Sequence, residues 1–121
     1  MTNKECPFCD SSQYEKTHGL AACRLDRYPV SVGHRLIIPI RHVEKFSDIT
    51  SAEMKDILDL ARLQIAIIEP SADGFNVGWN LGYAAGQIVP HVHLHIIPRI
   101  SGDVPDPKGG IRGVIPEKKV Y

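Results

Sequence analysis

The 121-residue chain lacks the long apolar run of a membrane protein and the basic excess of a nucleic-acid-binding protein. Its longest apolar stretches, Leu36–Ile40 and Ala66–Ile68, are far shorter than the roughly 20 residues that cross a bilayer. Lys and Arg total 14 and Asp and Glu total 14, so the formal net charge is zero. Met1–Cys6 contains no apolar segment typical of a secretory signal. We therefore expect a cytoplasmic protein with neither a membrane nor a nucleic acid as partner.

Cysteine is also scarce. An odd count of three, without a secretory signal, argues against a disulfide framework. Two of the three form Cys6-Pro7-Phe8-Cys9, and a CxxC pair in a reducing compartment indicates metal binding or redox chemistry. A thioredoxin-like redox pair belongs near a βαβ pattern, whereas this pair precedes every predicted strand. Metal binding is the favoured interpretation, and Cys23 is expected in the core.

Length and composition indicate one globular domain over residues 1–121, because hydrophobic residues make up 43% and charged residues 23%. The chain divides into an arm at 1–18, a central part and an irregular tail at 101–121, which is rich in Pro and Gly. Thr50 and Glu53 form a capping box before a helical apolar pattern that ends near Pro70. The predicted strands are Leu20–Asp26, His34–Ile40, Gly74–Asn80 and Val89–Pro98. This order predicts an α+β fold in which one long helix covers an antiparallel sheet.

Three histidines alternate with apolar residues in the segment His91-Val92-His93-Leu94-His95-Ile96-Ile97. Alternate side chains of a strand point to opposite faces, so we expect the three imidazoles on one face and the apolar residues under the helix. Lys, Thr or Ser would serve equally well on a merely exposed face, and this concentration of histidine therefore indicates function. Two chemistries fit the pattern. One is a catalytic metal with an open position for water, and the other is attack on phosphorus by a neutral imidazole.

A glycine-rich loop, Gly78–Gln87, precedes the histidines. Its glycines allow backbone N–H groups to approach an anion closely, and the amides of Asn80 and Gln87 are neutral donors to phosphate oxygens. Beside the histidines, this loop favours a phosphoryl ligand and hence the nucleophilic chemistry.

The segment His91–Ile97 resembles the His-φ-His-φ-His-φ-φ motif, where φ is apolar, of the histidine-triad (HIT) superfamily. Further matching pieces are Gly33-His34 leading into Leu36–Pro39, then His42, and Gly86-Gln87 shortly before the histidines. The resemblance covers roughly residues 6–99. It implies an α+β fold whose sheet extends across a two-fold homodimer, and an activity as a nucleotide hydrolase or transferase that passes through a covalent nucleotidyl-histidine.

The resemblance also implies roles for individual residues. His93 is the nucleophile toward the α-phosphorus, His95 lies near the α-phosphate oxygens and helps to protonate the leaving group, and His34 supports the triad from behind. The implied nucleotide-binding residues are Asp26 at the ribose, Asn80 beside the scissile phosphate, Gly86, Gln87, His93 and His95. An acidic carboxylate that accepts from two ribose hydroxyls is physically sensible.

One departure from the family pattern and one further resemblance are relevant to the substrate. Ile88 stands where many nucleotide phosphoramidases have Ser or Thr, so their hydroxyl contact to phosphate or amine is missing. The tail segment Gly102–Arg112 resembles bacterial HIT proteins that are labelled diadenosine-tetraphosphate hydrolase-like.

The cysteine pair supplies two of the four ligands that a structural zinc site needs. His42 follows the second predicted strand and His91 opens the histidine segment, so they complete the set. A subset of the HIT superfamily, like the related galactose-1-phosphate uridylyltransferases, is similar in having a CxxC pair, one histidine after the second strand, and the first histidine of the motif. We expect structural Zn²⁺ on Cys6, Cys9, His42 and His91, holding the arm to the sheet, and no organic cofactor.

These observations predict a nucleotide-binding hydrolase or nucleotidyl transferase acting at the α-phosphate of nucleoside phosphate esters or phosphoramidates. Its substrate would be a purine nucleotide or a dinucleoside polyphosphate. One alternative is a non-catalytic nucleotide-binding adaptor or sensor. Another is a zinc-dependent hydrolase with its metal on His91, His93 and His95.

Overall fold

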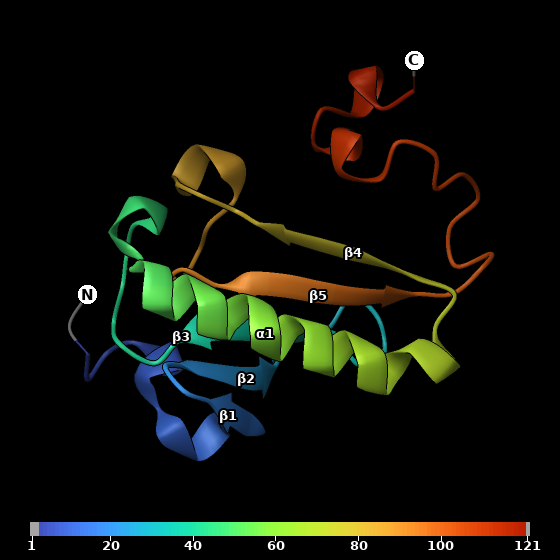
Figure 1. The fold of residues 1–121 in the computed structure, drawn as a ribbon. Helices are drawn as coiled ribbons and strands as arrows, with labels where there is room; N and C mark the ends of the chain where they lie inside the picture. Colours follow the sequence, from blue (N-terminus) through green and yellow to red (C-terminus); the bar gives the residue numbers. More distant parts are fainter. Residues whose placement is uncertain (1–2, 121) are drawn as a thin grey trace.

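One long helix lies across one face of a five-stranded antiparallel sheet (Figure 1). The computed structural model describes residues 3–120, so Met1, Thr2 and Tyr121 of the predicted domain lie outside it. The sheet order is β1-β2-β3-β5-β4, and every neighbouring pair is antiparallel. The elements are β1 (Lys16–His18), β2 (Ala21–Leu25), β3 (Arg35–Pro39), α1 (Ser51–Ile68), β4 (Gly74–Trp79) and β5 (Leu94–Arg99). The predicted α+β class, with a single long helix on the sheet, is confirmed.

The helix begins at the predicted capping box. The Thr50 hydroxyl accepts from the Glu53 N–H, and the Glu53 carboxylate accepts from the Thr50 N–H. The inward face of α1 packs against β2, β3 and β5. The resulting core contains Ala21, Cys23, Ile37, Ile57, Leu60, Ala61, Leu94 and Ile96. Burial of this apolar face, rather than helix propensity, holds α1 on the sheet.

The predicted strand Val89–Pro98 is wrong in its first half, because β5 begins only at Leu94. The backbone before it is held elsewhere: Val92 donates its N–H to the Val43 carbonyl rather than to a sheet partner. His91 and His93 therefore precede the strand, and only His95 lies within it. Strand alternation alone does not describe how the three rings are oriented.

The short edge strand β1 was not predicted. Lys16, Thr17 and His18 show no apolar alternation, and β1 is specified by its pairing with β2. The N-terminal arm packs on the sheet face opposite α1, where Cys6 and Phe8 contact Ala22, Leu36 and Ile38.

The chain beyond β5 forms two short 3₁₀ turns, Gly110–Val114 and Pro116–Lys118, and lies beside β4 (Figure 1). Among the described residues 3–120, no helix is long and apolar enough to span a bilayer.

Candidate functional site

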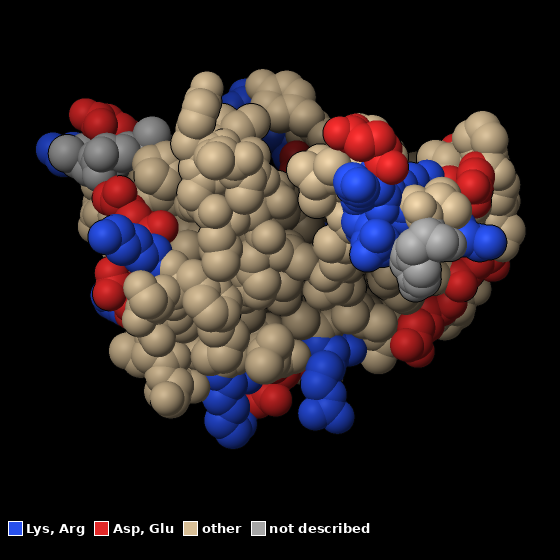
Figure 2. All heavy atoms as spheres, turned by 90° about the horizontal axis from the view of Figure 1, so that it is seen from above, with Lys and Arg blue, Asp and Glu red and all other residues tan. Residues whose placement is uncertain are grey.

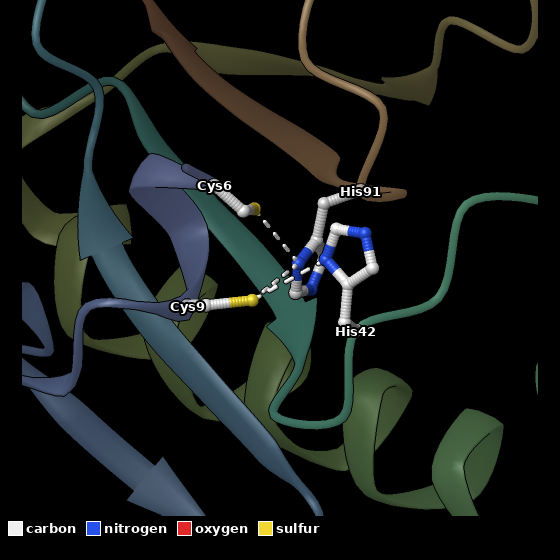
Figure 3. Close-up of side chains that lie close together, drawn as sticks. All are labelled: Cys6, Cys9, His42 and His91. Carbon is white, nitrogen blue, oxygen red and sulfur yellow. Dashed lines mark hydrogen bonds between the residues drawn. The ribbon is translucent and has the colours of Figure 1, made fainter. Parts of the chain in front are cut away.

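Four side chains from three distant segments converge beside the sheet (Figure 3). Cys6 precedes the first 3₁₀ turn and Cys9 ends it, His42 follows β3, and His91 precedes β5. Their ligand atoms all lie within 4.8 Å of one another. The Nδ1 atom of His91 is 3.4 Å from the Cys6 Sγ and 3.6 Å from the Cys9 Sγ, and the Nδ1 atom of His42 is 3.3 Å from the Cys9 Sγ.

These separations match the edges of a zinc tetrahedron. With Zn–S near 2.3 Å and Zn–N near 2.0–2.1 Å, tetrahedral geometry places sulfur and nitrogen ligands about 3.6 Å apart. Burial and the neighbouring Cys6 raise the pKa of the Cys9 thiol to about 11. A bound cation would favour the two thiolates over the thiols. The donor set and its spacing therefore fit Zn²⁺.

The second nitrogen of each histidine is also arranged as in a metal site. The Nε2–H of His91 donates to the Pro39 carbonyl at 2.8 Å, which leaves the Nδ1 lone pair toward the sulfur atoms. The His42 Nε2 is 3.2 Å from a Glu44 carboxylate oxygen, so the proton of His42 is also on Nε2 and its lone pair is on Nδ1. Such outer hydrogen bonds orient metal-binding imidazoles and select the ligating nitrogen.

His93 is buried next to this cluster with 8% of its surface exposed. Its Nδ1 lies 2.8 Å from the His91 carbonyl oxygen. Because a carbonyl can only accept, Nδ1 carries the proton and the Nε2 atom of the neutral ring carries the lone pair. Burial lowers the pKa of His93, so the neutral ring is the form present at pH 7. His93 thus has the protonation state of a nucleophile.

His95 is held in the opposite tautomer, with its proton on Nε2. The Val30 N–H donates to the Nδ1 of His34, so the proton of His34 resides on Nε2. That Nε2–H faces the Nδ1 of His95 at 2.9 Å, and the proton of neutral His95 is therefore on its own Nε2. This Nε2 is buried and has no hydrogen-bond partner within residues 3–120. Burial lowers the pKa of His95 to about 4, and nearby His93 and His34 contribute to the shift.

The His93 and His95 rings lie side by side, with centroids 5.0 Å apart. One ring presents a lone pair and its neighbour presents an unsatisfied N–H donor. An acceptor oxygen, such as that of a phosphoryl group, would satisfy this donor. The pair can therefore combine nucleophilic attack with hydrogen bonding to the developing charge or to the leaving group.

The three-histidine metal site considered from the sequence finds no support in this geometry. Among the described residues, the groups of side chains that could hold a metal ion place His91 with Cys6 and Cys9. They place His95 with Asp26 and His34. None of them contains His93, whose Nδ1 is engaged by the His91 carbonyl.

Asp26 links the triad to a nearby cavity. One carboxylate oxygen is 3.3 Å from the His34 Nε2 and 4.0 Å from the His95 Nδ1, and the other accepts from the Tyr28 N–H. Asp26 also lines a polar cavity of about 370 Å³. The rest of the lining is Pro7, Asp10, Gln13, Glu15, Arg24, Leu25 and Arg27.

The residues of the glycine-rich loop differ in their exposure, backbone conformation and hydrogen bonds. Asn80 is exposed, and its amide lies 4.0 Å from where a Cβ on Gly86 would be. Gly86 has φ of +95°, a conformation that favours glycine. The Gln87 side chain accepts from the Gly82 N–H and donates to the Val89 carbonyl, so it closes the loop. Ile88 is 89% exposed.

Sequence reasoning assigned no role at the site to Phe8, which borders His93, or to Arg24, which borders Phe8. Phe8 packs edge-on against the His93 ring, and the Arg24 guanidinium lies over the Phe8 ring. No sequence pattern pointed to Arg24, because an arginine in a strand is expected at the surface.

Comparison with known families matches residues 13–102 to the HIT domain model. The AP-4-A phosphorylase of Mycobacterium tuberculosis is 34% identical over 107 residues, which cover 80% of this chain and 55% of the relative. The asymmetrical bis(5'-nucleosyl)-tetraphosphatase of Schizosaccharomyces pombe is 42% identical over 86 residues, covering 69% of this chain and 47% of the relative. The chain thus spans about half the length of these curated relatives.

Solved structures share the fold. A Zn-bound histidine-triad family protein from Mycobacterium smegmatis superposes with a TM-score of 0.71 and 32% sequence identity. The match covers 87% of this chain and 86% of the other.

Proposed function

Because the chain belongs to the HIT domain family, we propose that it is a nucleotide-binding hydrolase or nucleotidyl transferase that acts at the α-phosphate. One observation carries this proposal: two adjacent imidazoles have opposite protonation at Nε2, with the lone pair on His93 and the hydrogen on His95. The relatives named AP-4-A phosphorylase and bis(5'-nucleosyl)-tetraphosphatase support a dinucleoside polyphosphate as substrate.

In the first step the His93 Nε2 lone pair attacks the α-phosphorus, and the bond from phosphorus to the leaving phosphate oxygen breaks. The His95 Nε2–H donates a hydrogen bond to the phosphoryl oxygens and stabilises their developing charge, and the leaving phosphate departs as an anion that exchanges protons with water. In the second step water, or another acceptor such as phosphate, attacks the nucleotidyl-histidine. The P–N bond breaks, the lone pair returns to His93, and the proton released by the acceptor passes to the solvent.

Around this step we propose that Asp26 binds the ribose and that the base occupies the 370 Å³ cavity that Asp26 lines. Asn80 and the backbone of Gly86 would contact phosphate oxygens. Gln87 acts indirectly in this scheme, because both ends of its amide already bond to the loop backbone. Exposed Ile88 has no hydroxyl for a phosphoramidate amine, so oxygen esters are the favoured substrates.

The test is intact-mass analysis after mixing the protein with diadenosine tetraphosphate, and in parallel with adenosine phosphoramidate. We expect wild type to gain the mass of one nucleotidyl group on His93. His93→Ala should lose the adduct, whereas His18→Ala, which changes a partly exposed histidine on β1, should keep it. Tight nucleotide binding without an adduct would instead support a non-catalytic adaptor or sensor.

We further propose that the bound metal is structural Zn²⁺. The approach of the Cys6, Cys9, His42 and His91 ligand atoms to within 4.8 Å of one another supports it, as does the Zn-bound relative. All four ligands come from the chain, so the ion has no open position for water. Elemental analysis should find one zinc per chain, and Cys9→Ser should lose it.

A homodimer joined through β4 is also proposed. β4 is an end strand of the sheet, and Gly74–Trp79 contains no charged residue. Exposed edges usually carry charges or proline that prevent pairing, and this edge has neither. Figure 2, which looks down on this side, shows a broad uncharged surface between charged margins. Sedimentation should give twice the chain mass, whereas a monomer at micromolar concentration would contradict the proposal.

We propose a cytoplasmic location as well. The described cysteines are free thiols, two of them in the metal cluster, and such thiols persist in a reducing compartment. Fractionation of the source cells would test this.

A further inference from the structure

Phe8 lies between the metal cluster and His93. It belongs to the 3₁₀ turn Pro7–Cys9 that joins the two cysteines, and it is only 7% exposed. Its ring centroid is 6.0 Å from that of His91 and 4.9 Å from that of His93, with interplanar angles of 73° and 77°. The same ring therefore packs edge-on against a metal ligand and against the proposed nucleophile.

A cation holds the Phe8 ring in place. The Arg24 guanidinium carbon is 4.8 Å from the ring centroid, and the Arg24 NH1 group donates to the Pro7 carbonyl at 2.7 Å. Arg24 is itself only 6% exposed, so this contact is largely shielded from water. Ala22, Leu36 and Ile38 complete the packing around Phe8. The ring cannot turn without disturbing either the cysteine turn or β2.

The His93 ring depends on this support because one hydrogen bond does not define its orientation. Its Nδ1–H donates to the His91 carbonyl, but hydrogen-bond angles are tolerant and the outer torsion of a histidine is broad. An edge-on aromatic contact contributes a second, directional constraint. In-line attack on phosphorus requires the nucleophile within a narrow range of distance and angle.

We propose that Phe8 is a positioning residue: its ring fixes the angle of the His93 imidazole and thereby connects the cysteine turn to the nucleophile. The kinetic consequence rests on the proposed function, whereas the effect on the ring of His93 does not.

The first test compares Phe8→Leu with Phe46→Leu. Phe46 is a matched control, because it also packs edge-on against an aromatic ring, that of Trp79, at 5.3 Å. We expect Phe8→Leu to keep one zinc per chain and to lower kcat about 10- to 100-fold, the size expected for a misplaced reacting group. KM should change less than about threefold, because Phe8 does not line the cavity assigned to the base. Phe8→Tyr, which keeps the ring, should restore most of kcat.

A second measurement does not require turnover. Diethyl pyrocarbonate modifies accessible imidazole nitrogens, and peptide mass spectrometry can follow its reaction at His93. In Phe8→Leu the mobile, less shielded ring should react several-fold faster, while Phe46→Leu should match wild type. If wild type forms no nucleotidyl adduct, the proposed function fails, yet this comparison still decides the role of Phe8.

Arg24→Met provides a variant that keeps Phe8 and both cysteines should Phe8→Leu fail to fold. It removes the cation over the ring and the hydrogen bond to the Pro7 carbonyl. Because Arg24 also lines the cavity assigned to the base, the readout for this variant is the rate of His93 modification, which should rise, but by less than in Phe8→Leu. Unchanged kcat and unchanged His93 modification in the folded, zinc-containing variants would overturn the inference. A loss in Phe46→Leu equal to that in Phe8→Leu would do the same.

Discussion

Hydrogen bonds from the backbone give two neighbouring histidines different chemical roles. The His91 carbonyl accepts from His93 and so keeps the His93 proton on Nδ1. The Val30 N–H donates to His34, whose Nε2–H donates to His95 and so keeps the His95 proton on Nε2. Both rings are neutral because burial lowers their pKa values. Nucleophile and donor are thus distinguished by what each ring contacts and not by residue type.

The residue spacing was sufficient to predict the four metal-cluster residues, which the structure brings together. It was not sufficient for the tautomers, since these depend on the backbone groups of Val30, Pro39 and His91 that approach only on folding. The assigned catalytic and nucleotide-binding roles remain predictions for the experiments above.

Acid sensitivity is one consequence at the residue scale. His95 has a pKa of about 4 in the folded chain and near 6.5 when unfolded, so the unfolded chain takes up its proton first. Its contribution to stability is full above pH 6.5 and is lost as the pH falls toward 4. Because the side chain keeps 20% exposure, we expect a loss of about 1–2 kcal/mol between pH 7 and pH 5. Urea unfolding at both pH values would measure it.

His95→Asn is the control for this acid effect. It removes the titrating ring and should reduce the difference in unfolding free energy between pH 7 and pH 5 by about that amount. An unchanged difference would assign the acid sensitivity to other groups, such as the metal ligands, instead of His95.

At the scale of elements, sequence patterns located β2, β3, β4 and α1 well. The helix α1 buries one apolar stripe, β2 and β3 are buried along almost their whole length, and β4 packs Phe75 and Trp79 against the core. The patterns failed where contacts with distant residues determine whether a strand forms or where it begins. The start of β5 is delayed because Val92 bonds to the Val43 carbonyl, and the polar edge strand β1 exists through its pairing with β2.

The start of α1 yields a stability prediction. Glu53 is buried, closes the capping box and pairs with Arg41 at 2.8 Å; this hydrogen bond lowers the pKa of Glu53 to about 2. Glu53→Gln keeps a capping side chain but loses the charge, and should cost about 1 kcal/mol at pH 7, while Glu53→Ala should cost about 2 kcal/mol. The pair contributes fully above pH 4.5 and is lost as the pH falls through 2.

An exposed ion pair on the same helix provides the comparison. Lys55 and Asp59 are 2.8 Å apart, but the Lys55 side chain is 75% exposed. Asp59→Asn should therefore destabilise the protein far less than Glu53→Ala in urea unfolding. If its cost equalled that of Glu53→Ala, burial of the Glu53 carboxylate would not explain its effect.

At the scale of the whole molecule, the metal cluster connects three segments that are distant in the chain: the arm, the turn after β3 and the approach to β5. We therefore expect binding of the proposed zinc to be coupled to folding, and the affinity should fall as the pH falls, because the ligands must be deprotonated. Chelation of the holoprotein should lower its thermal midpoint by an amount on the order of 10 °C, equivalent to at least about 2 kcal/mol.

Glu44 tests this coupling without removing a ligand. Its carboxylate lies 3.2 Å from the His42 Nε2 and fixes the nitrogen that faces the Cys9 sulfur. Glu44→Gln should weaken zinc binding about 10-fold, the lower end of the range for such outer contacts, because Glu44 is half exposed. Glu69→Gln, at an exposed site beyond α1, should leave the affinity unchanged. Competition with a chromogenic chelator would measure both variants. Equal affinities would mean that the His91 side of the cluster, held by the Pro39 carbonyl, is sufficient to orient the ion.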